Sequence, residues 1–551
     1  MYRTAPAPPD KLMPPAARYR LYVLGTLYCA PYLAMLVWGW QAYKARSILT
    51  LLLTIALGLL VLGALTRSWR RLFLAYIPFL LVSVAYAAYA FSFGVVPGHT
   101  LAIVLVSASW EELQGLWTVW QGKWLLLPLL AFLGVYLWLA WSLPDWPIFS
   151  GRARVVTRVL LALALPVTAF AAQNARQLVD GLALNPVAGS VMFCAGQIPR
   201  ARAEIHGAGI VKFPYHARRL DSGEEVHILV VGESARRGSW SAYGYQRPTT
   251  PYLNHLEGGV FLQRAMADAN LTSFAVPMIL TGMTPEQVTS ERPHGTLLDL
   301  AKEAGYWTAW LVNQDLDVST WLGITADHLE YPPDPQAGFF GRHTPDDVLL
   351  PAYRRELARV GAPRFIGMHI MESHWEYYRR YPPSFQRFGS ASRLNALSIL
   401  LKGGTIAPDL TDAYDNSVLY TDWFLQQVIE QARGLQVPAT VTFIPDHGES
   451  LPALDGGAAG HGQAFYNAAQ FEIPAFVWVN NAYRAVHPRQ VVALKKNAAR
   501  EIRSPDFFYT VADLMGITWP QARPERSFAS PQFVPDTSAK LLVGGALVTR
   551  P

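Results

Sequence analysis

Long apolar stretches occupy the first third of the chain and predict helices that cross a membrane. Each is about 19–22 residues long, which is enough for a helix to span about 30 Å of hydrocarbon. Four of them are nearly free of charge: Leu21–Trp40, Ile48–Thr66, Leu72–Phe93 and Trp124–Leu143. A fifth, Val155–Ala172, contains Arg158, whose long side chain can reach the membrane interface from near a helix end. A cleaved signal peptide fits the first segment poorly, because Pro31 breaks its apolar run and further segments follow.

Basic residues in the connecting loops predict the orientation of these helices. They gather before the first segment, between the second and third, and between the fourth and fifth, and they are fewer in the other loops. These residues are Arg3, Lys11, Arg18, Arg20, Arg67, Arg70, Arg71, Arg152, Arg154 and Arg158. The positive-inside rule then places the N-terminus in the cytoplasm and everything after Ala172 outside, which in a bacterium is the periplasm. The sequence therefore predicts a multi-pass protein of the inner membrane.

A tryptophan-rich stretch near residues 108–121 lies between two of the predicted spans. Trp110, Leu113, Trp117 and Trp120 recur at helical spacing and form one apolar stripe on a segment too polar to span. A helix of this kind either lies in the membrane interface, where tryptophan is favoured, or packs against the bundle. The pattern does not separate the two alternatives.

From about Gly223 the pattern changes to short apolar runs that alternate with amphipathic stretches, which predicts an α/β domain with a mainly parallel sheet. The predicted strands are Val226–Val231, Trp307–Val312, Phe365–Ile370, Val441–Ile444 and Ile473–Val479. The predicted helices are Thr296–Ala304 and Asp415–Ala432. We therefore expect a five-span membrane domain over residues 1–175, a linker over 176–222 and an outer catalytic domain over 223–551.

Composition narrows the class of protein. Hydrophobic residues make up 51% of the 551 residues and charged residues 16%, which excludes a disordered chain and a simple cytosolic domain. The two cysteines, Cys29 and Cys194, exclude a disulfide framework and a cysteine-rich zinc module. The net charge of +6 is small for this length, and no nucleic-acid partner is expected.

Acidic and histidine residues follow three of the predicted strands. Glu233 follows the first strand, Glu372 and His374 follow the third, and Asp446 and His447 follow the fourth. In parallel sheets, ligands gather outside the carboxyl ends of the strands. Two carboxylates and an imidazole suit zinc, with a fourth position left for a nucleophile or a water molecule.

A serine hydrolase is the competing interpretation of the first motif. A nucleophile elbow needs Gly-x-Ser-x-Gly, and Gly232-Glu233-Ser234-Ala235-Arg236 lacks the last glycine. We therefore reject a Ser-His-Asp hydrolase at this position.

Several motifs of the outer domain resemble, in order, those of bacterial phosphoethanolamine transferases. These are inner-membrane enzymes of the sulfatase/alkaline-phosphatase superfamily, whose fold the resemblance implies for the outer domain. The motifs are Val230–Arg236, Tyr243–Pro251, His369–His374 with Tyr381-Pro382, Tyr414–Val418, Asp446–Ser450 and Gly460–Gly462. The five-span anchor matches this family as well.

The resemblance implies particular roles for site residues. The family's nucleophile is a threonine five residues before a proline, which in Asn270–Pro277 is Thr272. It implies one tightly bound zinc ion held by Glu233, Thr272, Asp446 and His447. His374 and His461 match histidines that contact the substrate head group or a second zinc ion. Without the motif, Thr272 is better interpreted as a helix cap, and Ser273 beside it is the alternative nucleophile.

The resemblance also implies the substrates. The donor is phosphatidylethanolamine, diacylglycerol is released, and the acceptor is an envelope glycolipid or glycan, either lipid A or a core sugar of lipopolysaccharide. The lipid A branch usually carries several disulfides in this domain, whereas here Cys194 is the only cysteine after the spans, so the sequence is closer to the disulfide-free branch. Two alternatives remain: a phosphoglycerol transferase acting on periplasmic glycans, and an inactive membrane-anchored scaffold. A sulfatase activity is disfavoured, because the Cys/Ser-x-Pro-x-Arg context of formylglycine is missing at Thr272–Val276.

Overall fold

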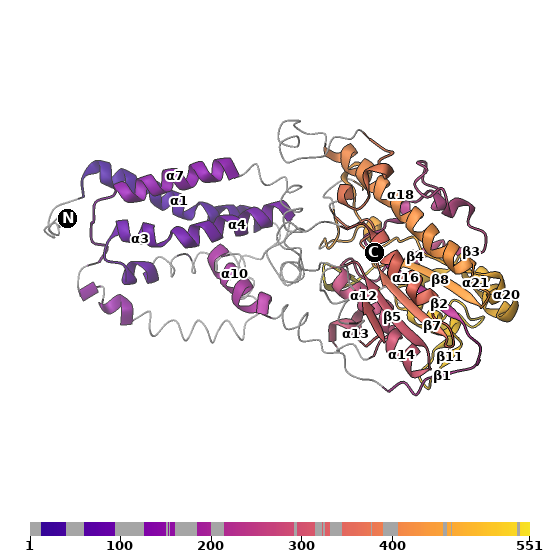
Figure 1. Cartoon of the computed structure of the whole chain (residues 1–551). Coiled ribbons are helices and arrows are strands. Elements are labelled where there is room, and N and C mark those ends of the chain that lie inside the picture. Colours follow the sequence, from indigo (N-terminus) through magenta and orange to yellow (C-terminus); the bar gives the residue numbers. More distant parts are fainter. Residues whose placement is uncertain are drawn as a thin grey trace. The chain divides into compact units, whose positions relative to one another are not determined.

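The chain was analysed as a computed structural model, shown in Figure 1. It describes residues 13–39, 55, 60–93, 126–149, 152–153, 155–159, 185–199, 214–290, 295–314, 322, 325–330, 344–375, 377–389, 406–455, 460–463, 465–536 and 540–550. The described residues form two compact units, one within residues 13–199 and one within residues 214–550.

The first unit is a set of apolar helices. They are α1 (Pro15–Gly39), α3 (Trp69–Ala75), α4 (Ile77–Phe93), α7 (Leu126–Ser142) and α10 (Pro186–Met192). Buried tyrosines pack between them, and their hydroxyls are paired: Tyr76 donates to the Tyr32 hydroxyl at 2.9 Å and Tyr136 to the Phe73 carbonyl at 3.1 Å. A buried hydroxyl without a partner would destabilise the unit, so these pairs fix how the helices pack.

Three of the five predicted spans coincide with described helices, namely α1, the α3–α4 pair and α7. Within the described part of the chain, no single helix is both long and apolar enough to cross a membrane, although Trp69–Ala75 and Ile77–Ala87 pass that test as a pair bent by 47°. Most of Ile48–Thr66 and of Val155–Ala172, and all of the tryptophan-rich stretch near 108–121, lie outside the described residues.

The second unit is built on a mixed sheet of seven strands among the described residues, in the order β3-β9-β8-β2-β7-β5-β6. The strands are β2 (Val226–Gly232), β3 (Gly259–Phe261), β5 (Trp307–Val312), β6 (His328–Glu330), β7 (Arg364–His369), β8 (Ala439–Pro445) and β9 (Phe476–Val479). β8, β2, β7, β5 and β6 are parallel, whereas β9 is antiparallel to both of its neighbours. The prediction of a mainly parallel sheet is confirmed, and the reversed direction of β9 was not foreseen.

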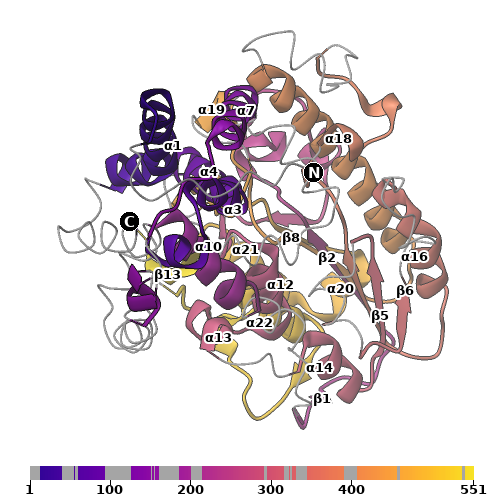
Figure 2. The ribbon, with the colours of Figure 1, turned by 90° about the vertical axis from the view of Figure 1, so that its left-hand side faces the viewer.

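Helices cover both faces of this sheet (Figures 1 and 2). Ile228 and Val230 of β2 pack in one core cluster with α16 (Leu350–Leu357) and α18 (Ile406–Arg433). Leu229 and Val231 pack in the other, with α12 (Thr272–Thr281), α14 (Leu297–Glu303) and α22 (Asp506–Leu514). Successive side chains of a strand point to opposite faces, and because both faces are covered every residue of β2 is buried.

The remaining elements complete the unit. They are α13 (Pro285–Ser290), α19 (Pro452–Asp455), α20 (Asn481–Val486), α21 (Pro488–Asn497), β1 (Arg218–Arg219), β4 (Arg264–Met266), β10 (Glu501–Arg503), β11 (Ile517–Thr518), β12 (Lys540–Val543) and β13 (Ala546–Thr549). Strands β12 and β13 form a hairpin that contacts the chain just before α12, where the Leu542 amide donates to the Asp268 carbonyl at 2.8 Å. The predicted helices are present as α14, with a capping box between Thr296 and Asp299, and as the longer α18.

Candidate active site

The site lies at the carboxyl ends of β2, β7 and β8, where the sequence placed it. The structure brings together Glu233 after β2, Asp446 and His447 after β8, and Thr272 at the start of α12. The Thr272 hydroxyl oxygen is 3.3 Å from each carboxylate oxygen of Glu233 and 3.3 Å from Nε2 of His447. Residues up to 214 positions apart therefore converge on one hydroxyl group.

Asp446 is held by the backbone so that one of its oxygens faces the cluster. Its Oδ1 accepts the amide hydrogens of Ser234 at 3.1 Å and of His447 at 2.7 Å. Its Oδ2 is buried and, among the described residues, accepts no hydrogen bond, although it lies 3.2 Å from Nε2 of His447. Burial raises the pKa of Asp446 above its ordinary value, and the hydrogen bonds to its carboxylate and the nearby His461 oppose that effect only in part.

His447 presents a lone pair to the same point. Its Nδ1 lies 2.9 Å from the Gly448 carbonyl and donates to it, so the neutral ring keeps Nε2 unprotonated. Burial, together with the nearby His461, holds the pKa of His447 well below its ordinary value. A neutral imidazole fixed through its other nitrogen is the usual form of a histidine metal ligand.

These donors fit a zinc ion. A carboxylate oxygen without a partner, a neutral imidazole nitrogen and a second buried carboxylate supply the oxygen and nitrogen ligands that zinc accepts, and Thr272 occupies the remaining side. By mutual distance alone, the ligand atoms that lie within 4.8 Å of one another belong to Glu233, His447 and His461. We favour Asp446 over His461 as a ligand because its Oδ2 accepts no hydrogen bond from the described residues, whereas His461 is bonded to a carboxylate.

Two residues next to the cluster have positive φ without being glycine. Ser234 has φ 56° and Glu372 has φ 38°, each just beyond a strand end. Such strain persists where surrounding bonds enforce it, and it is typical of functional sites. Here Glu372 Oε2 accepts the Glu233 amide at 2.9 Å, and the Ser234 hydroxyl donates to Glu233 Oε1 at 3.0 Å. Both residues therefore hold Glu233 in position, and Ser234 is not placed as an elbow nucleophile.

The two predicted histidines lie beside the cluster. The His461 ring centroid is 4.2 Å from that of His447 and 5.7 Å from that of His374. Nδ1 of His461 is 2.8 Å from Oε2 of Glu449, whose other oxygen accepts the Tyr377 hydroxyl. A carboxylate behind the ring fixes its orientation.

Thr272 opens α12, after Leu271 in extended conformation. The N-terminus of a helix favours negative charge, which suits a phosphate carried on this hydroxyl. The neighbouring Ser273 hydroxyl is buried and has no hydrogen-bond partner within the described chain, so the geometry favours Thr272 over Ser273.

Sequence reasoning missed two residues of the site. Gln314 follows β5, and its amide nitrogen is 3.5 Å from Glu233 Oε2 and 3.0 Å from the Ile370 carbonyl. The strand-end rule that selected the other residues would have found it. The second residue is Glu449, which orients His461 by a hydrogen bond. The loop between the two residues brings them together, and no pattern in the sequence indicates that contact.

Fold and site together define an α/β protein with a cluster of candidate metal ligands around a threonine hydroxyl at the carboxyl edge of its sheet. The chain belongs to the sulfatase family, whose model matches residues 226–517.

Known proteins similar to this chain carry more specific names. Phosphoethanolamine transferase EptC of Escherichia coli K12 is 26% identical over 335 residues, which cover 57% of this chain and 55% of the relative. The chain thus spans about half the length of the curated relatives it matches. The names agree with the resemblance that the motifs indicated.

Solved structures show the same fold. The integral membrane protein lipooligosaccharide phosphoethanolamine transferase A of Neisseria meningitidis has a TM-score of 0.64 at 20% identity, and the match covers 94% of this chain and 99% of that one. The C-terminal periplasmic domain of EptC from Escherichia coli, solved in complex with zinc, has a TM-score of 0.55 at 22% identity and covers 62% of this chain and 96% of that one. The architecture of a helical part followed by a sulfatase-type domain is therefore supported along nearly the whole chain.

Proposed function

We propose that this chain transfers phosphoethanolamine from phosphatidylethanolamine to lipid A or a core sugar of lipopolysaccharide. The names of its relatives support the reaction, and the solved zinc complex of one relative supports the metal. The observation that carries the proposal is the Thr272 hydroxyl, which lies 3.3 Å from both Glu233 and His447 at a helix N-terminus.

In the first half-reaction, Thr272 is the nucleophile. Its oxygen attacks the phosphorus of the donor as its proton passes to a neighbouring histidine, the bond to the glycerol oxygen breaks, and diacylglycerol leaves with that proton. A zinc ion held by Glu233, Asp446 and His447 would lower the pKa of the Thr272 hydroxyl and polarise the phosphoryl oxygen. The product is phosphoethanolamine bound to Thr272, so the kinetics are ping-pong.

In the second half-reaction, a histidine takes the proton from the acceptor hydroxyl. His461 suits this role because Glu449 fixes its ring, and His374 lies close enough to contact the head group. The acceptor oxygen then attacks the phosphorus and Thr272 is released unchanged.

The location of the reaction follows from the predicted topology. We propose that the second unit is periplasmic and that the first unit anchors it in the inner membrane, beside its lipid donor. The printed names of the two solved relatives, an integral membrane protein and a periplasmic domain, support this arrangement.

The test is to trap the intermediate. Full-length protein incubated with phosphatidylethanolamine and no acceptor should gain one phosphoethanolamine unit, which peptide mapping places on Thr272. Thr272→Ala should lose the adduct and reduce diacylglycerol release by at least about 100-fold, because among the described hydroxyls that of Thr272 is the one within 3.3 Å of both Glu233 and His447. Ser273→Ala is the matched control and should retain both.

The same assay decides between donors. Phosphatidylglycerol replaces phosphatidylethanolamine in a parallel reaction, and an adduct formed only from phosphatidylglycerol would show a phosphoglycerol transferase instead. Sustained transfer to an acceptor by Thr272→Ala would refute the covalent mechanism.

A further inference from the structure

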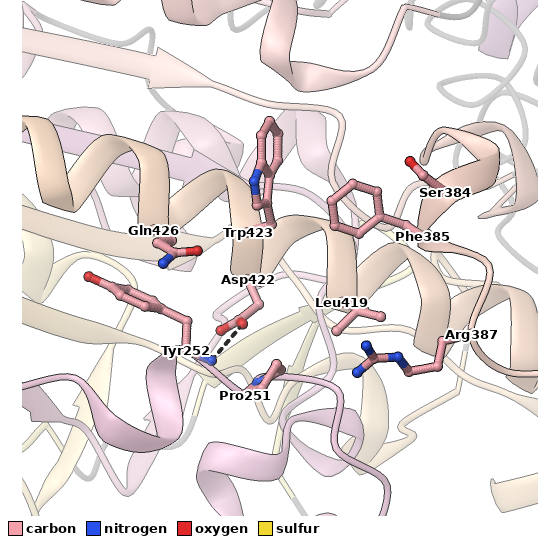
Figure 3. Close-up of a pocket in the computed structure, with 9 residues that line it drawn as sticks. All are labelled: Pro251, Tyr252, Ser384, Phe385, Arg387, Leu419, Asp422, Trp423 and Gln426. Carbon is pink, nitrogen blue, oxygen red and sulfur yellow. Dashed lines mark hydrogen bonds between the residues drawn. The ribbon is translucent and has the colours of Figure 1, made fainter.

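A cavity of about 450 Å³ lies beside α18, and none of the candidate metal ligands lines it. Its walls are α18, the loop around Phe385 and Arg387, and the segment at Pro251 and Tyr252 (Figure 3). Pockets that hold small ligands measure about 300–1,000 Å³, so this cavity is large enough for one.

Buried polar side chains of α18 fix both walls. The amide oxygen of Asn416 accepts the backbone N–H groups of Arg387 and Phe388, each at 2.8 Å. The carboxylate of Asp422 accepts those of Tyr252 at 2.9 Å and Leu253 at 3.0 Å. The cavity is therefore pre-formed, which reduces the entropy that binding must overcome.

The lining combines aromatic rings with unused polar groups. The ring centroids of Phe385 and Trp423 are 5.5 Å apart, and Figure 3 shows both rings along the same side. In the described part of the chain, the Arg387 guanidinium has no ion pair, and neither the Gln426 amide nor the Ser384 hydroxyl has a hydrogen bond. Aromatic faces beside hydrogen-bond donors suit the apolar faces and hydroxyl groups of sugar rings.

The charge of the lining favours an anionic ligand. Asp422 is the acid that lines the cavity; both of its oxygens are used by backbone amides, and burial raises its pKa to about 7. Arg387, at one end of the cavity in Figure 3, is the cation left to bind a ligand. Arginine binds phosphate through two parallel hydrogen bonds.

The cavity lies at a fixed distance from the catalytic residues along α18. At one end of this stretch, the Tyr414 hydroxyl donates to the Ser234 carbonyl at 2.7 Å, next to Glu233. Leu419 and Gln426, which line the cavity, are five and twelve residues further along the helix. A rise of 1.5 Å per residue places them about 8 and about 18 Å from Tyr414 along the helix axis. An oligosaccharide can bridge this span and a single sugar cannot.

We propose that this cavity binds a phosphate-bearing saccharide of the acceptor while another sugar of the same molecule reacts at Thr272. The inference rests on the proposed function and assigns the substrate class of its second half-reaction. Trp423 and Phe385 stack against a sugar ring, Gln426 and Ser384 bind its hydroxyl groups, and Arg387 binds its phosphate.

The test is direct binding to the full-length protein in lipid nanodiscs, measured by titration calorimetry. The probes are phosphorylated core oligosaccharide released from lipopolysaccharide by mild acid, the same oligosaccharide after dephosphorylation, and inorganic phosphate. Arg387→Gln should weaken binding of the phosphorylated probe about ten- to a hundredfold and leave the dephosphorylated probe nearly unaffected. Trp423→Ala should weaken both. Arg489→Gln, which removes an exposed arginine from α21, is the matched control and should change neither.

Equal affinity of wild type and Arg387→Gln for the phosphorylated probe would overturn the inference, and so would inorganic phosphate binding as tightly as the oligosaccharide. If Trp423→Ala fails to fold, Arg387→Gln still decides, because that side chain is exposed and makes no ion pair with any described residue. The proposed function is tested separately, by diacylglycerol release from wild-type protein without acceptor. If wild-type protein released no diacylglycerol, the transferase reaction would be refuted. The binding measurements would still show whether the cavity binds the oligosaccharide.

Discussion

Glu225 lies buried between two histidines at the amino end of β2, whereas the candidate site lies at the carboxyl end of the same strand. Its carboxylate oxygens are 3.0 Å from Nε2 of His227 and 2.7 Å from Nε2 of His487. Burial raises the pKa of Glu225, and the bonds to the two histidines outweigh that effect and lower it to about 2. The charged form therefore stabilises the fold, and it joins the sheet to the start of α21.

Glu225→Gln should lower the free energy of unfolding at pH 7 by about 2 kcal/mol, the typical value of a hydrogen bond to a charged group. A lowered carboxyl pKa gives stability that is present above about pH 4.5 and is lost as the pH falls towards about 2. The difference in the free energy of unfolding between wild type and variant should therefore become smaller from pH 7 to pH 3. Thermal unfolding followed by tryptophan fluorescence measures both effects. Glu257→Gln, which changes an exposed acid, should leave the midpoint of thermal unfolding unchanged at both pH values. If Glu225→Gln destabilised the protein equally at pH 7 and pH 3, this account would be contradicted.

At the residue scale, the sequence predicts a candidate side chain where it follows a strand. Glu233, Asp446 and His447 were found this way, because a parallel sheet brings its carboxyl ends together. Thr272 came only from resemblance, since a threonine at a helix start is commonly a cap. Glu449 was not found as the partner of His461, because that contact is made by a loop with no periodic pattern.

At the scale of elements, the turn after β8 has no room for a side chain at Gly448. A Cβ placed there would lie 2.1 Å from the carbonyl oxygen of Ala469, and backbone cannot rotate away. The Gly448 amide also donates to the Gln470 carbonyl at 2.9 Å, so the two segments are joined at this point. Asp446 and His447 immediately precede Gly448, so a shift of the backbone at Gly448 would also displace these two side chains.

Gly448→Ala should therefore reduce both zinc content and transfer activity by at least about tenfold, because relieving such a clash costs about 1–3 kcal/mol and displaces the ligands. Metal analysis of the purified protein measures the first quantity and the transfer assay the second. Asp446→Asn provides the reference for a site that lacks a ligand. Gly434→Ala is the matched control, since its Cβ would meet only the Gln431 carbonyl at 3.5 Å. Normal zinc content in Gly448→Ala would show that this turn does not position the ligands.

The sequence predicted the five longest strands of the sheet but not the two at its edges. β2, β5, β7 and β8 are buried on both faces and show as continuous apolar runs. β3 and β6 are three residues long and partly exposed, which is too short for any periodic signal. The reversed direction of β9 depends on its connection and not on its own residues, so pattern alone could not give it.

At the scale of the whole molecule, three described arginines of the first unit lie near helix ends that contact the end of α7 and the residues just after it. Near the start of α1, Arg20 donates to the Ser142 carbonyl at the end of α7, at 3.0 Å. At the start of α3, Arg71 lies 3.4 Å from Asp145, and the Arg70 guanidinium is 4.7 Å from the centre of the Trp141 ring. The clustering of basic and aromatic side chains at one end supports the proposed cytoplasmic face.

A reporter that fluoresces only in the cytoplasm should stay dark when fused after Pro551, because the proposed topology carries the second unit across the membrane. The same reporter fused after Arg71 should be bright, since that loop belongs to the basic face. Fluorescence of whole cells, with immunoblots to match protein levels, provides the measurement. A bright fusion after Pro551 would reverse the topology and remove access to periplasmic acceptors.

The hairpin of β12 and β13 has a consequence for how the protein matures. Besides the bond to Asp268, its Leu542 carbonyl accepts the Asn270 amide at 3.3 Å and its Gly544 amide donates to the Asn270 side chain at 2.8 Å. These contacts hold the chain two to four residues before Thr272. The segment that supports Thr272 therefore lies some 270 residues further along the chain, and it is synthesised and exported after Thr272. Under the proposed function, we therefore expect a chain that still lacks the hairpin to be inactive, because the contacts that hold Asn270 near Thr272 are then missing.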